Sequence, residues 1–230
     1  MSSFILKIIA IITMFIDHLS FAYNGSFSYL NFLGRLSFPI FAFQISEGYL
    51  HTKNIKKYLF RLLLFAVISQ IPFSLFLHLV AGADIYSLNI FFTLILGLIS
   101  IIIYDEFFFK NKNKYKHIFK FLAVFMLIII SIIAQVLKCD YGAFGVIVIL
   151  LFHIFKNKKI LMSLSFVIAC IVKNLINILL YKNIIIYSFI TLFTISSIIP
   201  ILIYNGKQGY TSKFYKYFRS SFFLTTYYIK

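Results

Sequence analysis

The residues that could do chemistry in this sequence are few, because only six acidic side chains occur among 230 residues. Three of them, Asp17, Glu47 and Asp140, lie in or beside long apolar runs. An ionisable group inside a bilayer costs at least about 2.5–3.5 kcal/mol and is retained mainly for function. His18 follows Asp17 directly, and a histidine beside a carboxylate that orients it is a usable general base. Arg35 could hold Asp17 or stabilise charge on a carbonyl oxygen. A salt bridge between Asp17 and Arg35 that only joins two helices is the alternative.

Further polar side chains in apolar surroundings extend this set. Glu47 and His51 lie four residues apart on one helical face, where they could act at an entrance or be merely interfacial. Gln70 and Pro72 could line a site or only shape a kink. Six residues are expected to line the side of a site where a substrate would bind: Gln70, Asn89, Asp140, Tyr141, Lys173 and Asn174. For Lys173 and Asn174 the alternative is packing between helices.

Membrane-spanning helices must position these residues. Hydrophobic residues make up 62% of the chain and charged residues 12%, which excludes a soluble protein and a disordered chain. At about 20 residues per span, the apolar runs predict an all-α polytopic bundle of about eight transmembrane helices over residues 1–204. The runs cover residues 4–22, 29–50, 58–80, 88–104, 118–137, 142–155, 160–180 and 184–204.

Lysines in the predicted connections orient the bundle. They gather in segments 51–57, 105–117 and 156–159 and in the tail 205–230, and the alternate connections carry at most one basic residue. The positive-inside rule therefore places both termini in the cytoplasm, with Asp17, Arg35 and Asp140 toward the outer side. Topology explains the net charge of +16, so no nucleic-acid partner is predicted. Asp84, Asp105 and Glu106 are expected in solvated loops, and His153 at a loop or interface.

Common enzyme motifs are absent from the sequence. It contains no HExxH, GxSxG or P-loop motif, and no cluster with metal-ligand spacing, so no metal is predicted. The two cysteines, Cys139 and Cys170, form no CxxC pair.

Six segments form a recognisable series: LKIIAIITMFIDH from Leu6, NFLGRLSFPIFAFQISEGYLHTKN from Asn31, YLFRLLLFAVISQIPF from Tyr58, NIFFTLILGL from Asn89, DYGAFGVIVIL from Asp140 and YNGKQG from Tyr204. In order and spacing they resemble the TraX family. Lys7, ten intervening residues and His18 are also weakly similar to an Arg-x10-His pattern in integral-membrane O-acyltransferases. A helix places these two residues roughly 16 Å apart.

The resemblance implies a multi-pass protein of the bacterial cytoplasmic membrane, linked to conjugative pilus systems. It implies acetyl transfer from acetyl-CoA to an acceptor such as a pilin N-terminus. It also implies that the lipid bilayer surrounds the protein. In this interpretation Asp17, His18, Arg35 and Glu47 form the catalytic set. The residues expected to meet the acyl donor are cationic or lie at the cytoplasmic entrance: Lys7, His51, Lys53 and Arg61.

Two other functions stay open. Intramembrane charges also mark ion and proton pathways, which makes a transporter or channel the first alternative. A non-catalytic assembly factor for a pilus or secretion machine is the second. The tail 205–230 favours it, because the TraX-like aromatic pattern beginning at Lys216 continues without the family's Pro and His, as in a truncated or diverged chain.

Overall fold

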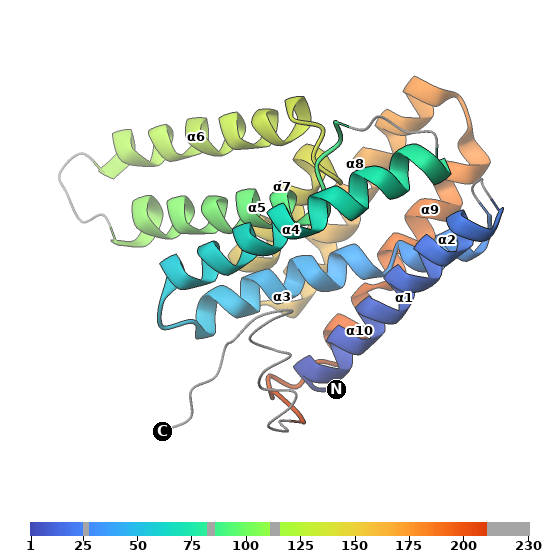
Figure 1. Ribbon diagram of the computed structural model, residues 1–230. Helices are drawn as coiled ribbons and strands as arrows, with labels where there is room; N and C mark the ends of the chain where they lie inside the picture. The colour runs from blue at the N-terminus through green and yellow to red at the C-terminus, as the bar shows by residue number, and fades with distance from the viewer. Residues whose placement is uncertain (25–27, 82–85, 111–115, 211–230) are drawn as a thin grey trace.

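The computed structural model describes residues 1–24, 28–81, 86–110 and 116–210, and every regular element in these parts is helical (Figure 1). This confirms the predicted all-α class. Asp84, the lysines within 111–115 and most of the tail lie outside the described residues. The elements are α1 (Ser3–Asn24), α2 (Leu30–Gly34), α3 (Ser37–His51), α4 (Ile55–Ala81), α5 (Ile90–Asp105), the π-helical turn η1 (Glu106–Lys110), α6 (Lys116–Val136), α7 (Gly142–Ile154), α8 (Lys159–Tyr181), α9 (Ile184–Ser196) and α10 (Ile198–Leu202).

Several of these helices are built to face lipid. Six stretches are long and apolar enough to cross a membrane, and they lie on α1, α4, α5, α6, α8 and α9–α10. Large apolar side chains point outward from them: Leu179 is 78% exposed, and Ile71 and Phe60 are similar. Such a surface would be costly in water and is suited to hydrocarbon. The protein is therefore a multi-pass membrane protein.

All eight predicted runs are helical, but two of them are interrupted. The run 29–50 breaks at Arg35 and Leu36 into α2 and α3, and the run 184–204 breaks at Ser197 into α9 and α10. The Ser197 hydroxyl donates to the carbonyl of Thr194 at 2.6 Å, a local bond that competes with the regular helical ladder. The short α3 and α7, of 15 and 13 residues, are about 22 and 20 Å long, less than the roughly 30 Å of hydrocarbon.

The N-terminus, the end of α10, the start of α8 and the end of α3 lie together at one end of the bundle. The Met1 ammonium donates to the Ile203 carbonyl at 2.8 Å, and Lys159 Nζ donates to the Leu202 carbonyl at 3.1 Å. The Tyr204 hydroxyl bonds to Glu47, which brings the end of α3 to the same place. We call this the basic end. The cytoplasmic location of this end stays a prediction.

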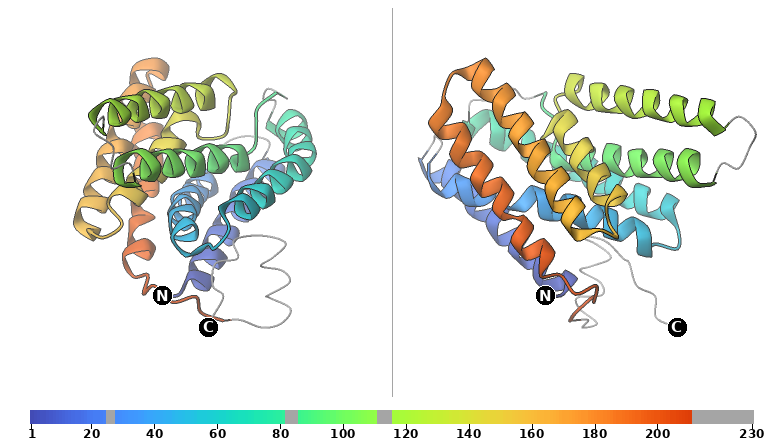
Figure 2. Two further views of the ribbon diagram at one scale, coloured as in Figure 1. Left: turned by 90° about the vertical axis from the view of Figure 1, so that its left-hand side faces the viewer. Right: turned by 180° about the vertical axis from the view of Figure 1, so that it is seen from behind.

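The core lies around α3 and α7. Phe38, Ile45, Ile149 and Phe152 are buried, and α3 is buried over almost its whole length from Ser37 to Ser46. Helices α5 and α6 form one hairpin beside this core and α8 and α9 another, as Figure 2 shows. Because α3 and α7 are shorter than the helices around them, a recess remains above the start of α7, at the end opposite the basic end.

Candidate functional site

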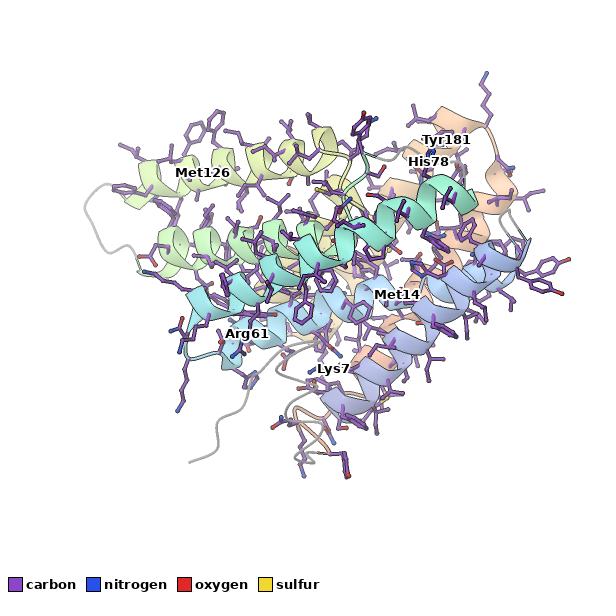
Figure 3. The ribbon with its side chains drawn as sticks, in the orientation of Figure 1. Lys7, Met14, Arg61, His78, Met126 and Tyr181 are labelled. Atoms are coloured by element: carbon purple, nitrogen blue, oxygen red, sulfur yellow. The ribbon has the colours of Figure 1, made fainter. Side chains whose placement is uncertain are left out.

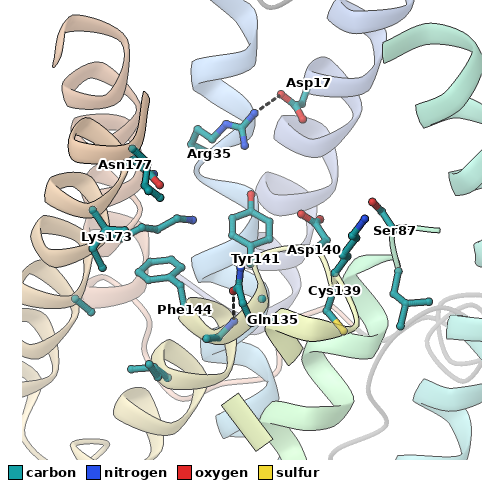
Figure 4. A pocket seen from close by; sticks show the side chains of 18 of the residues that line it. Asp17, Arg35, Ser87, Gln135, Cys139, Asp140, Tyr141, Phe144, Lys173 and Asn177 are labelled. Atoms are coloured by element: carbon teal, nitrogen blue, oxygen red, sulfur yellow. Dashed lines mark hydrogen bonds and ion pairs between the residues drawn. The ribbon is translucent and has the colours of Figure 1, made fainter. Parts of the chain in front are cut away.

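The recess above α7 is a cavity of about 1060 Å³. Helices α1, α4 and α8 form its walls, and residues 138–144 form its floor (Figure 4). At a rise of about 1.5 Å per residue, Asp17 lies about 10 Å below the end of α1 and Lys173 about 12 Å below the end of α8. Its polar lining comes from residues far apart in the sequence: Asp17, His18, Arg35, Asp140, Tyr141, Lys173 and Asn177.

Asp17 and Arg35 join α1 to the break between α2 and α3. Asp17 Oδ1 lies 3.8 Å from the Arg35 guanidinium and accepts a hydrogen bond of 2.9 Å from the Asn31 amide. Gly34 permits this approach, because a Cβ there would lie 2.5 Å from Asp17 Cγ. Arg35 is also hydrogen-bonded to the Tyr141 hydroxyl. The guanidinium is thus already engaged by two partners within the protein.

His18 has the hydrogen bonding that a general base needs. Its Nδ1 lies 2.7 Å from the Met14 carbonyl oxygen. Because a carbonyl only accepts, Nδ1 carries the proton, and Nε2 of the neutral ring keeps its lone pair. We expected Asp17 to orient this ring, but successive side chains on a helix point in different directions. The ring is oriented instead by the backbone carbonyl of Met14, one turn earlier. It also packs against Phe76, at 5.2 Å between ring centroids.

Backbone hydrogen bonds hold the floor of the cavity in place. The Asp140 amide donates to the Leu88 carbonyl at 2.8 Å, and the Leu88 amide donates to the Lys138 carbonyl at 3.1 Å. The Thr93 hydroxyl donates to the Asp140 carbonyl. The connection between α6 and α7 is therefore fixed to the start of α5, which holds the side chains of this connection at the cavity.

Tyr141 occupies an unusual backbone position at this floor. Its φ is +64°, a left-handed conformation that bulky residues adopt only where the surroundings fix them. The ring stacks on Phe38 at 3.9 Å between centroids, which supplies that constraint. Strained residues of this kind cluster at functional sites.

The charges at the floor are half-buried and lie near one another. Burial raises the pKa of the Asp140 carboxyl, while the nearby Arg35, Lys173 and His18 favour its charged form. Lys173 Nζ lies 4.2 Å from the ring centroid of Phe144 and 5.1 Å from that of Tyr141. The lysine thus approaches the cavity over two aromatic faces, an arrangement that stabilises a cation.

Two residues predicted to contact the acceptor, Gln70 and Asn89, lie outside the cavity lining. Gln70 Nε2 donates to the Ser87 carbonyl at 2.8 Å, and its Oε1 accepts from the Asn89 amide at 3.0 Å. Asn89 also caps α5 and donates to the Ala66 carbonyl at 2.8 Å. Their amides secure the connection that carries Ser87, which does line the cavity. Asn174 is absent from the lining, and Asn177, one turn further along, lines it instead.

The residues predicted to meet an acyl donor lie at the basic end, away from the cavity. Lys7 and Arg61 are on the lower side of Figure 3, on α1 and α4. His51 ends α3, and Lys53 follows it. Glu47, on the last turn of α3, lies 4.0 Å from the His51 ring and does not line the cavity.

A second buried polar group at the basic end was missed. His153 Nε2 lies 2.9 Å from Asp105 Oδ1, and the histidine is only 1% exposed. The Tyr49 hydroxyl also bonds to Asp105. Asp105 is thus the last residue of α5 rather than part of a solvated loop, and His153 belongs to the core. No spacing in the sequence connects residues 105 and 153, so a single sequence carried no signal for this pair.

Comparison with known proteins places the chain in a family. The family model described as TraX protein matches residues 2–228. A probable fimbrial assembly protein FimC, serogroup H1, from Dichelobacter nodosus is 35% identical over 169 residues. That match covers 69% of this chain and 64% of the relative, so the chain spans slightly less than two thirds of that protein's length. No solved structure matches. Because the family model covers nearly the whole chain, this protein belongs to the TraX family.

Proposed function

We propose that the protein is a membrane acyltransferase that moves an acetyl group from acetyl-CoA to an amine or hydroxyl of an acceptor. One observation carries this proposal: a histidine with its Nδ1 bonded to a carbonyl opens into a deep cavity lined by Arg35, Asp140 and Lys173. A general base beside cations that can stabilise an oxyanion is what acyl transfer needs.

In the proposed transfer, His18 accepts one proton from the acceptor and returns it to the leaving thiolate. The acceptor nitrogen or oxygen attacks the thioester carbonyl carbon, and the carbonyl π electrons move to the oxygen. His18 Nε2 takes the proton of the attacking group. The carbonyl then re-forms, the carbon–sulfur bond breaks with its electron pair on sulfur, and the imidazolium returns the proton to sulfur. The products are the acetylated acceptor and free CoA thiol.

The donor would be held at the basic end. Lys53 is exposed there, and Lys7 and Arg61 are half-buried, so their charges suit a diphosphate; His51 and Glu47 would shape this entrance. From Lys7 the reactive carbonyl would have to extend roughly 16 Å along α1 to meet His18. Asp140, Tyr141 and Asn177 would face the acceptor in the cavity.

The acceptor class is proposed from the family and the relative. A relative with the name of a fimbrial assembly protein supports a place in pilus biogenesis or conjugation. A pilin-like acceptor at the outer side of the bacterial cytoplasmic membrane is compatible with a cavity at the end opposite the lysine-rich connections.

The test is acetyl transfer by the purified protein in proteoliposomes. Labelled acetyl-CoA is added with a pilin-like peptide, and wild type is compared with His18→Ala. We expect the variant to lose about 10²–10⁴-fold in rate, the usual contribution of a general base. His78→Ala is the matched control, because this histidine is exposed and lies outside the cavity lining. Equal rates for wild type and His18→Ala would refute the assigned base.

A non-catalytic assembly role is the second candidate, favoured by the name of the relative. It predicts that a pilin partner co-purifies with the protein while calorimetry detects no acetyl-CoA binding. Acetyl transfer that depends on His18 would exclude it.

A further inference from the structure

The proposed reaction places a negative charge on the carbonyl oxygen of the donor, and the cavity offers two half-buried cations to meet it, Arg35 and Lys173. Arg35 already has an ion pair with Asp17 at 3.8 Å and a hydrogen bond to Tyr141. Its charge is largely compensated before any substrate arrives. A guanidinium held by two protein groups would have to release one of them to bind an oxyanion.

Lys173 is held differently. Among the residues that the structure describes, it forms no ion pair within 4.0 Å, and its Nζ rests over the rings of Phe144 and Tyr141. It lines the cavity from α8, whereas His18 lines it from α1 (Figure 4 shows Lys173 reaching in from the left and the Asp17–Arg35 pair above the Tyr141 ring). At this depth an ammonium held by aromatic rings and by the nearby charge of Asp140, rather than by a close ion pair, is expensive to keep in a membrane, which points to a function in the reaction.

Asp140 belongs to the cavity floor, beside Tyr141 (Figure 4). Its carboxyl responds to the charges of Lys173, Arg35 and His18, so the cation and the base both lie near this floor residue. A carbonyl group bound over the floor would be within the influence of His18 on one side and Lys173 on the other. A base and an oxyanion stabiliser can act on the same reacting centre when that centre lies between them.

We propose that Lys173, rather than Arg35, is the catalytic residue that stabilises the carbonyl oxygen as it becomes negative. In that step the acceptor adds to the carbonyl carbon, the oxygen receives the π electron pair beside Lys173 Nζ, and His18 holds the acceptor's proton. The charge disappears when the carbonyl re-forms and the thiolate leaves. The inference rests on the proposed acyltransferase function.

The experiment measures kcat and KM for acetyl-CoA and for the peptide in Lys173→Met and Lys173→Arg. Methionine keeps the length of the side chain and removes its charge. We expect Lys173→Met to lose about 10²–10³-fold in kcat, the usual effect of removing one oxyanion donor, with both KM values within about threefold of wild type. Lys173→Arg should recover at least about tenfold of that loss. Lys182→Met, at the end of the same helix and outside the lining, is the control and should behave as wild type.

The outcomes separate this inference from the proposed function. An inactive wild type would overturn the acyltransferase proposal and the role of Lys173 with it. An active wild type together with a fully active Lys173→Met would overturn only the role of Lys173. Equal losses in Lys173→Met and Lys173→Arg, with lowered thermal midpoints in both, would show a packing role and also overturn it. If Lys173→Met does not fold, Lys173→Gln is measured against the same expectations.

Discussion

Replacing Gly34 by alanine tests the close contact that places Asp17 beside Arg35. The added Cβ would lie 2.5 Å from Asp17 Cγ and 2.6 Å from its Oδ1. Carbon atoms in ordinary contact are about 3.5–4.0 Å apart, so α1 and α2 must separate by roughly 1–1.5 Å. Overpacking of this kind costs about 1–3 kcal/mol in the free energy of unfolding. The separation would also carry the 3.8 Å Asp17–Arg35 pair out of contact range.

The same shift moves His18, the neighbour of Asp17, relative to the floor of the cavity. Misplacing reacting groups by about 1 Å can cost about 10²-fold in rate, so activity per folded molecule should fall by about 10–100-fold. Thermal unfolding in detergent and acetyl transfer in proteoliposomes measure the two effects. Gly97→Ala is the matched control, because its Cβ would clash with Cδ1, Cβ and Cγ2 of Ile149 on α7, away from the lining. Wild-type activity in Gly34→Ala, or an equal loss of activity in both variants, would show that the close contact at Gly34 does not position Asp17 and His18 for the reaction.

Three further predictions concern other parts of the molecule. Asp105→Ala should lower the free energy of unfolding by about 1–3 kcal/mol, because it leaves the buried His153 ring without its hydrogen-bond partner; an unchanged thermal midpoint would contradict this. Arg61→Ala should raise the KM for acetyl-CoA about tenfold and leave kcat unchanged, since one charge-assisted contact to the diphosphate is lost; an unaltered KM would remove Arg61 from the donor site. Burial raises the pKa of the Cys139 thiol to about 11. In a Cys170→Ala background, the rate of Cys139 alkylation by maleimide should therefore rise about tenfold per pH unit between pH 7 and 9. A rate that levels off near pH 8.5 would contradict a buried thiol at this position.

The fold was predictable where hydrophobicity determines it. Each of the eight apolar runs is helical, because a bilayer requires every backbone polar group to be satisfied within the span. The interruptions at Arg35 and Ser197 are harder to predict, since both positions lie within long apolar runs and keep right-handed helical backbone angles. The short length of α7 was visible in the sequence, but the cavity it leaves depends on how long its neighbours are.

The site was predictable where polar residues are scarce. Five polar side chains stand out in the sequence because each is expensive in apolar surroundings. The structure brings all five to one cavity: Asp17, His18, Arg35, Asp140 and Lys173. Gln70 and Asn89 looked equivalent in the sequence, yet they bond to backbone groups, because the connection between α4 and α5 has carbonyls and amides to satisfy. Partner choice of this kind depends on three-dimensional contacts that one sequence does not contain.

If acetyl transfer takes place inside the cavity above α7, a bulky group placed in that cavity should stop it. A cysteine is introduced at Asn177, which lines the cavity, or at Lys182, which does not, in a background without Cys139 and Cys170. Each variant is alkylated with a bulky maleimide before acetyl transfer is measured. We expect alkylation to abolish acetyl transfer by Asn177→Cys and to leave Lys182→Cys active. Full activity of alkylated Asn177→Cys would contradict it.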